Sequence, residues 1–133
     1  MKAFVVEDNP IDLKLWRALL QAYGHEAVTW NSADGALEQI RSLRPDIVLL
    51  DLNLAGADGL DLVRAMRSGA DTSDIPVLAV TAYPQRYTDA EVVDAGCSAM
   101  LVKPVDTRQI VREMQLLCER KARGRFDEHP DHR

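Results

Sequence analysis

Five short apolar runs alternate along the chain with longer segments of helical periodicity. Each run ends in, or is followed at once by, a polar residue; the runs are residues 1–8, 26–30, 47–51, 77–81 and 99–102. Regular alternation of strand and helix is typical of a parallel sheet covered by helices on both faces. The pattern therefore predicts an α/β domain with a doubly wound, five-stranded parallel sheet and five helices. The second run is the least apolar and is expected to be an edge strand.

The intervening segments carry helix start and stop signals. The first helix should begin at Pro10, after the cap residue Asn9, and should end at Gly24. Four apolar residues at four-residue spacing predict the face that packs on the sheet. They are Ile11, Leu15, Leu19 and Tyr23. The second helix is expected from about Ala33 to Leu43, before Pro45, and the third from Asp58 to Gly69.

The last two helices have different lengths in the predicted fold. Residues 88–91, Thr-Asp-Ala-Glu, form a capping box, and the spacing of Tyr87 and Val92 is that of a hydrophobic staple. The fourth helix should start near Asp89 and stop at Ala95, so that its stability must come from packing. The last helix should follow the cap residue Asp106, and its apolar periodicity fades from Glu119.

Size, charge and cysteine usage limit the classes of protein. At 133 residues the chain is one domain, predicted as a folded part over 1–122 and a polar, disordered tail over 123–133. The formal net charge of −5 gives no basic field for nucleic acid, and no apolar stretch reaches the roughly 20 residues of a membrane helix. Cys97 and Cys118 lack metal-ligand spacing, and two unpaired thiols are typical of a reducing cytoplasm.

Polar residues at the ends of the runs supply the candidate chemistry. In an open parallel sheet the carboxyl ends of the strands meet at one crevice, so Glu7, Asp8 and Asp51 should lie together. Oxygen ligands of this kind suit Mg²⁺, which relieves the repulsion between the carboxylates. Asp51 can act as a nucleophile that forms an aspartyl phosphate. Lys103 can supply a positive charge opposite the metal, and Thr81 can donate its hydroxyl to a phosphate oxygen.

Four motifs carry a resemblance to a known family. They are Val5-Val6-Glu7-Asp8-Asn9, Leu49-Leu50-Asp51-Leu52-Asn53 through Gly59, Val80-Thr81-Ala82, and Leu101-Val102-Lys103-Pro104. In this order and spacing the chain resembles, over about residues 2–120, the receiver domains of two-component response regulators. The resemblance implies the flavodoxin-like strand order 2-1-3-4-5. It also implies that Asp51 accepts phosphate from a histidine kinase or a histidine phosphotransfer protein.

The resemblance further implies a division of roles within the site. Mg²⁺ would bind Asp8, Asp51 and the main-chain carbonyl of Asn53, while Glu7 would order a coordinated water. The peptide bond between Lys103 and Pro104 would be cis, a form that proline makes accessible. Output would pass through the fourth helix, fifth strand and fifth helix to a downstream protein. The domain would assist its own phosphorylation and dephosphorylation without being an enzyme in the ordinary sense.

Three positions bear on how phosphorylation is reported. The family often has an aromatic residue where this chain has Met100, and Thr81, Ala82 and Met100 are the expected switch residues. When the threonine moves to the phosphate, Met100 can fill the vacated space but cannot expose a ring or hydroxyl. A proline common after the phosphoacceptor strand is replaced by Ala55, which should loosen that loop slightly. Tyr83 either packs on its own turn or leans over the site and limits attacking water.

Other functions remain as alternatives to a stand-alone phosphoacceptor. An aspartate-based phosphatase usually needs a second aspartate where this chain has Asn53. A flavin-binding module needs a donor-rich loop after the first strand, and Glu7-Asp8-Asn9-Pro10 would repel the flavin phosphate instead. Two alternatives stay open. The first is a receiver-like docking module that is not phosphorylated, and the second is a phosphate shuttle in a multistep relay.

Overall fold

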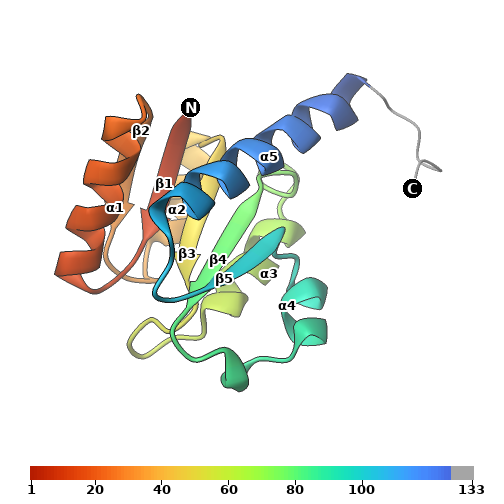
Figure 1. The fold of residues 1–133 in the computed structure, drawn as a ribbon. Helices are drawn as coiled ribbons and strands as arrows, with labels where there is room; N and C mark the ends of the chain where they lie inside the picture. Colours follow the sequence, from red (N-terminus) through yellow and green to blue (C-terminus); the bar gives the residue numbers. More distant parts are fainter. Residues whose placement is uncertain (127–133) are drawn as a thin grey trace.

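The computed structural model describes residues 1–126, which form three layers with a parallel sheet in the middle (Figure 1). The sheet has five strands in the order β2-β1-β3-β4-β5. Their bounds are β1 Lys2–Val6, β2 Glu26–Trp30, β3 Ile47–Asp51, β4 Val77–Thr81 and β5 Ala99–Val102. The predicted doubly wound sheet and its flavodoxin-like order are confirmed.

Helices cover both faces of the sheet, as predicted. Their bounds are α1 Pro10–Ala22, α2 Ala36–Leu43, α3 Gly59–Ser68, α4 Asp89–Ala95 and α5 Thr107–Phe126, with a short 3₁₀ helix, η1, at Pro84–Arg86. Buried residues of α1 and α5 share one core with the sheet, and buried residues of α2, α3 and α4 share the other. Among the described residues, no helix is long and apolar enough to cross a membrane.

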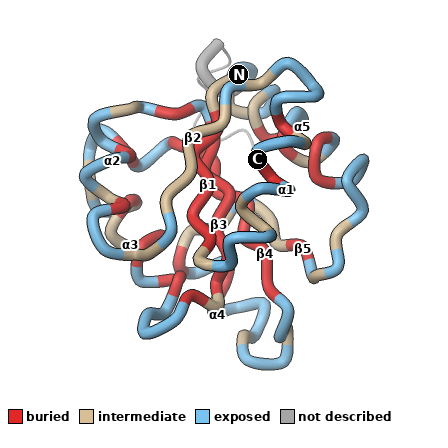
Figure 2. The backbone as a smooth tube through the Cα atoms, turned by 90° about the vertical axis from the view of Figure 1, so that its left-hand side faces the viewer, coloured by how far each residue is buried: buried red, intermediate tan, exposed pale blue. Residues whose placement is uncertain are grey.

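Burial along the strands explains why this sheet forms. Every residue of β3 and β4 is buried, whereas β2 has no buried residue and lies at an edge (Figure 2). Strands buried on both faces read as continuous apolar runs, which is the pattern of Ile47–Leu50. The edge position predicted for β2 is confirmed.

Local capping bonds fix where the helices start. The Asn9 side chain accepts hydrogen bonds from the backbone of Ile11 and Asp12 at the start of α1. The capping box predicted for α4 is present, with Thr88 and Glu91 bonding each other's backbone N–H groups. These bonds satisfy donors that a helix start leaves unpaired, so the short α4 begins and ends where the sequence predicts.

The prediction of the inward face of α1 is wrong for three of its four residues, because only Leu19 of the four packs against the core. Ile11, Leu15 and Tyr23 are 76%, 51% and 48% exposed, while Trp16 and Leu20 are buried against the sheet. Both sets of residues have helical spacing, so periodicity alone does not choose between them. The face carrying Trp16 buries a large aromatic side chain, which is the larger hydrophobic gain.

Two helix boundaries also differ from the predictions. Helix α2 starts at Ala36 rather than near Ala33, because Gly35 takes a positive φ of 75° beside the Trp30 ring. Helix α5 runs to Phe126, past the predicted domain end at residue 122. Its charged residues are good helix formers even where the apolar stripe has faded. The rest of the predicted tail, residues 127–133, lies outside the described residues.

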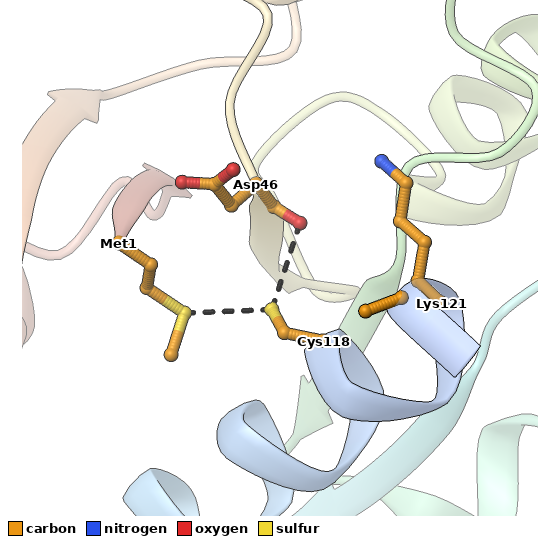
Figure 3. Close-up of a pocket in the computed structure, with 5 residues that line it drawn as sticks. Met1, Asp46, Cys118 and Lys121 are labelled. Carbon is orange, nitrogen blue, oxygen red and sulfur yellow. Dashed lines mark hydrogen bonds between the residues drawn. The ribbon is translucent and has the colours of Figure 1, made fainter. Parts of the chain in front are cut away.

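The amino-terminal end of the sheet carries a small pocket of about 260 Å³ between the chain start and α5 (Figure 3). The Cys118 Sγ lies 3.4 Å from the Met1 Sδ and 3.7 Å from the carbonyl oxygen of Asp46. Burial raises the pKa of the Cys118 thiol, which favours the protonated form. Cys118 and Cys97 are both free, as predicted, and Cys118 joins α5 to the first residue by packing.

Candidate functional site

The register of the parallel strands brings the predicted polar residues to one edge. Asp51 pairs with Val80 across β3 and β4, and Thr81 pairs with Val102 across β4 and β5. Lys103 follows immediately, and its backbone N–H donates to the Thr81 carbonyl at 2.8 Å. The carboxyl ends of the central strands therefore form the candidate site, where doubly wound folds place their ligands.

Three carboxylates form the acidic part of this site. One ligand oxygen from each of Glu7, Asp8 and Asp51 lies within 4.8 Å of the others. Glu7 is 1% exposed and Asp51 is 8% exposed, so both are buried. Backbone N–H groups hold two of the carboxylates: Asn53 donates to Asp51 Oδ1 at 2.8 Å, and Ala55 donates to Asp8 Oδ2 at 2.7 Å. An all-oxygen donor set at this spacing fits a hard divalent cation.

The ammonium group of Lys103 is shared by three carboxylates. Its Nζ donates to Glu7 Oε1 at 2.9 Å, to Asp12 Oδ2 at 3.0 Å and to Asp51 Oδ2 at 3.1 Å. An ammonium group has three donors, so every one of them is used. The peptide bond from Lys103 to Pro104 is cis.

Asp12 is a residue of this site that the sequence prediction did not include. It lies in the first turn of α1, four residues after Asp8. Helix α1 begins just after the end of β1, so its first turn lies beside the site, and the Asp12 carboxylate reaches Lys103 at the rim. An acid in the first turn of the helix that follows β1 was the signal available in the sequence.

Burial and charge change the acidity of the central groups. Burial, followed by the hydrogen bond to Asp51, raises the pKa of Glu7 to about 7. Burial alone would lower the pKa of Lys103, but its hydrogen bonds to Glu7 and Asp12 and the charge of Asp51 raise it overall. Lys103 therefore stays charged, while burial favours the protonated form of Glu7.

Neutral hydrogen bonds line the other side of Asp51. The Thr81 hydroxyl donates to Asn53 Oδ1 at 2.5 Å and accepts from the backbone N–H of Tyr83 at 3.0 Å. The Tyr87 hydroxyl donates to the carbonyl oxygen of Leu52 at 3.0 Å. The end of β4 and the loop that follows it are thus tied at two points to the loop after β3. The sequence identified Tyr87 only as a staple residue, because its contact with Leu52 spans 35 positions.

The remaining predicted residues lie around this centre. Tyr83 is 46% exposed, and the guanidinium of Arg86, from the same loop, stacks 4.6 Å from its ring centre. Met100 is partly buried against the core on the α2, α3 and α4 face. A pocket of about 400 Å³ opens beside Lys103. Its lining residues are Asp12, Leu15, Trp16, Ala82, Lys103, Pro104 and Val105.

Comparisons with known proteins agree with this fold. The family model of the response regulator receiver domain matches residues 3–115. The polar-differentiation response regulator DivK of Brucella anthropi is 31% identical over 111 residues, which cover 84% of this chain and 90% of that protein.

Solved structures of similar fold cover nearly the whole chain. A CheY-like receiver domain protein from Methanospirillum hungatei matches with a TM-score of 0.85 and 20% identity, covering 92% of this chain and 96% of that chain. The receiver domain of the sensor histidine kinase PA1611 from Pseudomonas aeruginosa matches with a TM-score of 0.81 and 24% identity, covering 89% and 97%. The chain belongs to the response regulator receiver domains, the phosphoacceptor domains of two-component signalling.

Proposed function

We propose that Asp51 accepts a phosphoryl group from a phosphohistidine of a histidine kinase or a histidine phosphotransfer protein. The observation that carries this proposal is the position of the Asp51 carboxylate. One of its oxygens accepts from Lys103, and both Glu7 and Asp8 lie beside it. In the transfer, an Asp51 oxygen forms a bond to phosphorus as the phosphorus–nitrogen bond of the histidine breaks. The electron pair of that bond leaves with the imidazole.

Mg²⁺ is the proposed cofactor. Asp8, Asp51 and the main-chain carbonyl of Asn53 would hold it, and Glu7 would act through a bound water. The ion would neutralise the carboxylates and the oxygens of the incoming phosphoryl group. Support comes from the close spacing of the three carboxylates and from the Pseudomonas aeruginosa receiver domain, which has a magnesium ion in its active site cleft.

Lys103 and Thr81 are proposed to serve the transferred phosphoryl group. When the Asp51 oxygen becomes part of the acyl phosphate, Lys103 can donate to a phosphoryl oxygen in its place. The Thr81 hydroxyl would give up its hydrogen bond to Asn53 and donate instead to another phosphoryl oxygen. The small side chain of Ala82 would leave room for that movement. These residues let the domain assist its own phosphorylation and dephosphorylation, so that it acts as a signalling phosphoacceptor.

The modulating residues are assigned by their surroundings. The Tyr83 ring stacks on Arg86 of its own turn, which favours a packing role and makes shielding of the phosphate from water the weaker alternative. Met100 fills apolar space at the position where the family often has an aromatic residue. We propose the α4, β5 and α5 face as the surface that meets the downstream partner. Its exposed apolar residues include Val93, at 69%, and Val102, at 46%.

A phosphodonor experiment tests the proposal. The full chain is incubated with phosphoramidate, with and without Mg²⁺, and the mass of one added phosphoryl group is followed. Wild type and Asp61→Asn, a first-turn acid of α3 outside the site, should be modified only with Mg²⁺. Asp51→Asn should show no modification, because an amide is not a nucleophile of this kind. Absence of modification in wild type would favour a docking module, whereas rapid transfer onward to a histidine protein would favour a phosphate shuttle.

A further inference from the structure

Tyr87 lies between the loop that follows Asp51 and the start of α4. Its hydroxyl reaches the carbonyl oxygen of Leu52, the residue directly after Asp51. Its backbone directly precedes Thr88, the cap residue of α4. One side chain therefore joins the peptide next to the phosphoacceptor to the first turn of a helix on the surface.

The Leu52 end of this connection is firmly held. Leu52 is fully buried, and its backbone N–H donates to the Val80 carbonyl at 2.9 Å. Its carbonyl oxygen accepts from the Gly59 N–H at 3.2 Å as well as from Tyr87. A Cβ at position 59 would lie 2.8 Å from the Leu52 Cα, so glycine is needed there. Because there is so little free space, a movement of the peptide after Asp51 would change the position of the Leu52 carbonyl and therefore its hydrogen bond with Tyr87.

The α4 end is equally direct. The Glu91 N–H donates to the Thr88 hydroxyl at 3.0 Å, and the Thr88 N–H donates to the Glu91 carboxylate at 2.9 Å. These bonds fix the residue that follows Tyr87 to the first turn of the helix. Helix α4 has only seven residues. A helix this short depends on its tertiary contacts, and the loss of one contact changes how often it opens.

The Tyr87 hydroxyl is suited to a lasting contact. Burial raises its pKa, so it remains a protonated donor at physiological pH. A second hydrogen bond to the loop after β3, from Thr81 at the end of β4 to Asn53, has to break if Thr81 turns to a phosphoryl oxygen. The Tyr87 tie involves no group that the phosphoryl would need. Met100 packs in the same core but offers no hydrogen bond donor.

We infer that Tyr87 positions α4 against the phosphoacceptor loop and carries a change at Asp51 to α4. It would serve this chain in place of an aromatic residue at position 100. The inference rests on the proposed function, because it needs a change at Asp51 to report. The coupling is reciprocal, so a partner bound at α4 would also alter phosphorylation through the same tie.

Amide hydrogen exchange on the full chain tests this role. Peptides covering residues 88–95 are compared with Mg²⁺ alone and with Mg²⁺ plus beryllofluoride, a phosphoryl mimic. Occupancy is followed independently by the fluorine NMR signal of bound beryllofluoride. The variants are Tyr87→Phe, which keeps the ring and removes the hydroxyl, and Met100→Leu. Tyr23→Phe is the matched control, because it removes an exposed tyrosine hydroxyl at the far end of α1.

Without beryllofluoride, exchange in residues 88–95 should be about fivefold faster in Tyr87→Phe than in wild type, the effect of losing one hydrogen bond. Beryllofluoride should change this exchange in wild type, Tyr23→Phe and Met100→Leu, and the change should fall to less than half in Tyr87→Phe. A full response in Tyr87→Phe, with bound fluoride present, would overturn the inference. A missing bound signal in wild type would instead refute the proposed function on which it rests.

Discussion

The two sides of Asp51 are built from different interactions. Its carboxylate side consists of Glu7, Asp8, Asp12 and Lys103, and its hydroxyl side consists of Asn53, Thr81 and Tyr87. Ion pairs hold the carboxylate side, mostly at the ends of buried strands. Neutral hydrogen bonds hold the hydroxyl side, of which Asn53 and Tyr87 lie on loops and Thr81 is the last residue of β4. Removal of one partner from a buried ion pair leaves a charge uncompensated and costs about 3 kcal/mol or more. Loss of an ordinary hydrogen bond costs only about 1 kcal/mol. The carboxylate side should therefore decide whether the reaction occurs, and the hydroxyl side how it is reported.

The largest effect is expected from Lys103→Met. Without the ammonium group, Glu7, Asp12 and Asp51 share no cation, and phosphorylation should slow about 100-fold. In EDTA the free energy of unfolding should fall by about 3 kcal/mol, as for a broken buried pair. Mg²⁺ should restore part of that stability, because it supplies positive charge to the same carboxylates. Urea unfolding with EDTA and with Mg²⁺ measures both effects.

Lys121→Met is the matched control for this experiment. The Lys121 side chain is 20% exposed, close to the 21% of Lys103, but its ion-pair partner Asp74, at 3.9 Å, is 65% exposed. Exposed pairs contribute about 1 kcal/mol or less, so the control should unfold nearly like wild type and should not respond to Mg²⁺. Equal losses for the two lysines would show that the carboxylate side has no special dependence on its cation.

The next effect is a pH dependence that comes from Glu7. Its pKa in the folded protein is about 7, against an ordinary value of 4.5, because burial favours the protonated form. Between these values the folded state binds more protons than the unfolded state. The free energy of unfolding in EDTA should therefore fall, by roughly 2 kcal/mol, as the pH rises from 4.5 through 7. Glu7→Gln resembles the protonated form and should lack this fall. If the free energy of unfolding changed with pH in the same way in wild type and Glu7→Gln, Glu7 would not be the source of the pH dependence.

The contrast between the two sides also explains what the sequence could predict. Glu7, Asp51 and Lys103 stand at strand ends, and local apolar runs locate strand ends well. Once the strands are parallel, register brings those ends together whatever the loops do. The fold class and the gathering of these side chains therefore follow from the apolar pattern, whereas the strand order was implied by the resemblance to receiver domains.

Contacts that depend on packing could not be predicted in the same way. Helix α1 has two apolar stripes, and only contact with the sheet decides that Trp16 and Leu20 are buried while Ile11 and Leu15 are exposed. The bond from Tyr87 to Leu52 joins residues far apart in the sequence, through a long side chain on a loop. A sequence pattern describes the position of a residue on its own element but not what its side chain reaches on another.

The smallest effect separates two possible roles of Asp12, the one member of the carboxylate side that lies on a helix. Its side chain is 31% exposed, so solvent screens the electrostatic interactions of its charge. Its Oδ2 atom nevertheless orients one of the three Lys103 N–H donors. If orientation dominates, Asp12→Ala should slow phosphorylation by phosphoramidate about threefold, since the ammonium loses one of its contacts. Asp12→Asn keeps an acceptor oxygen and should stay near the wild-type rate. The control is Asp61→Ala, which removes a first-turn acid from α3. If Asp12 acted instead by repelling the phosphoryl group, both Asp12 variants would react faster than wild type.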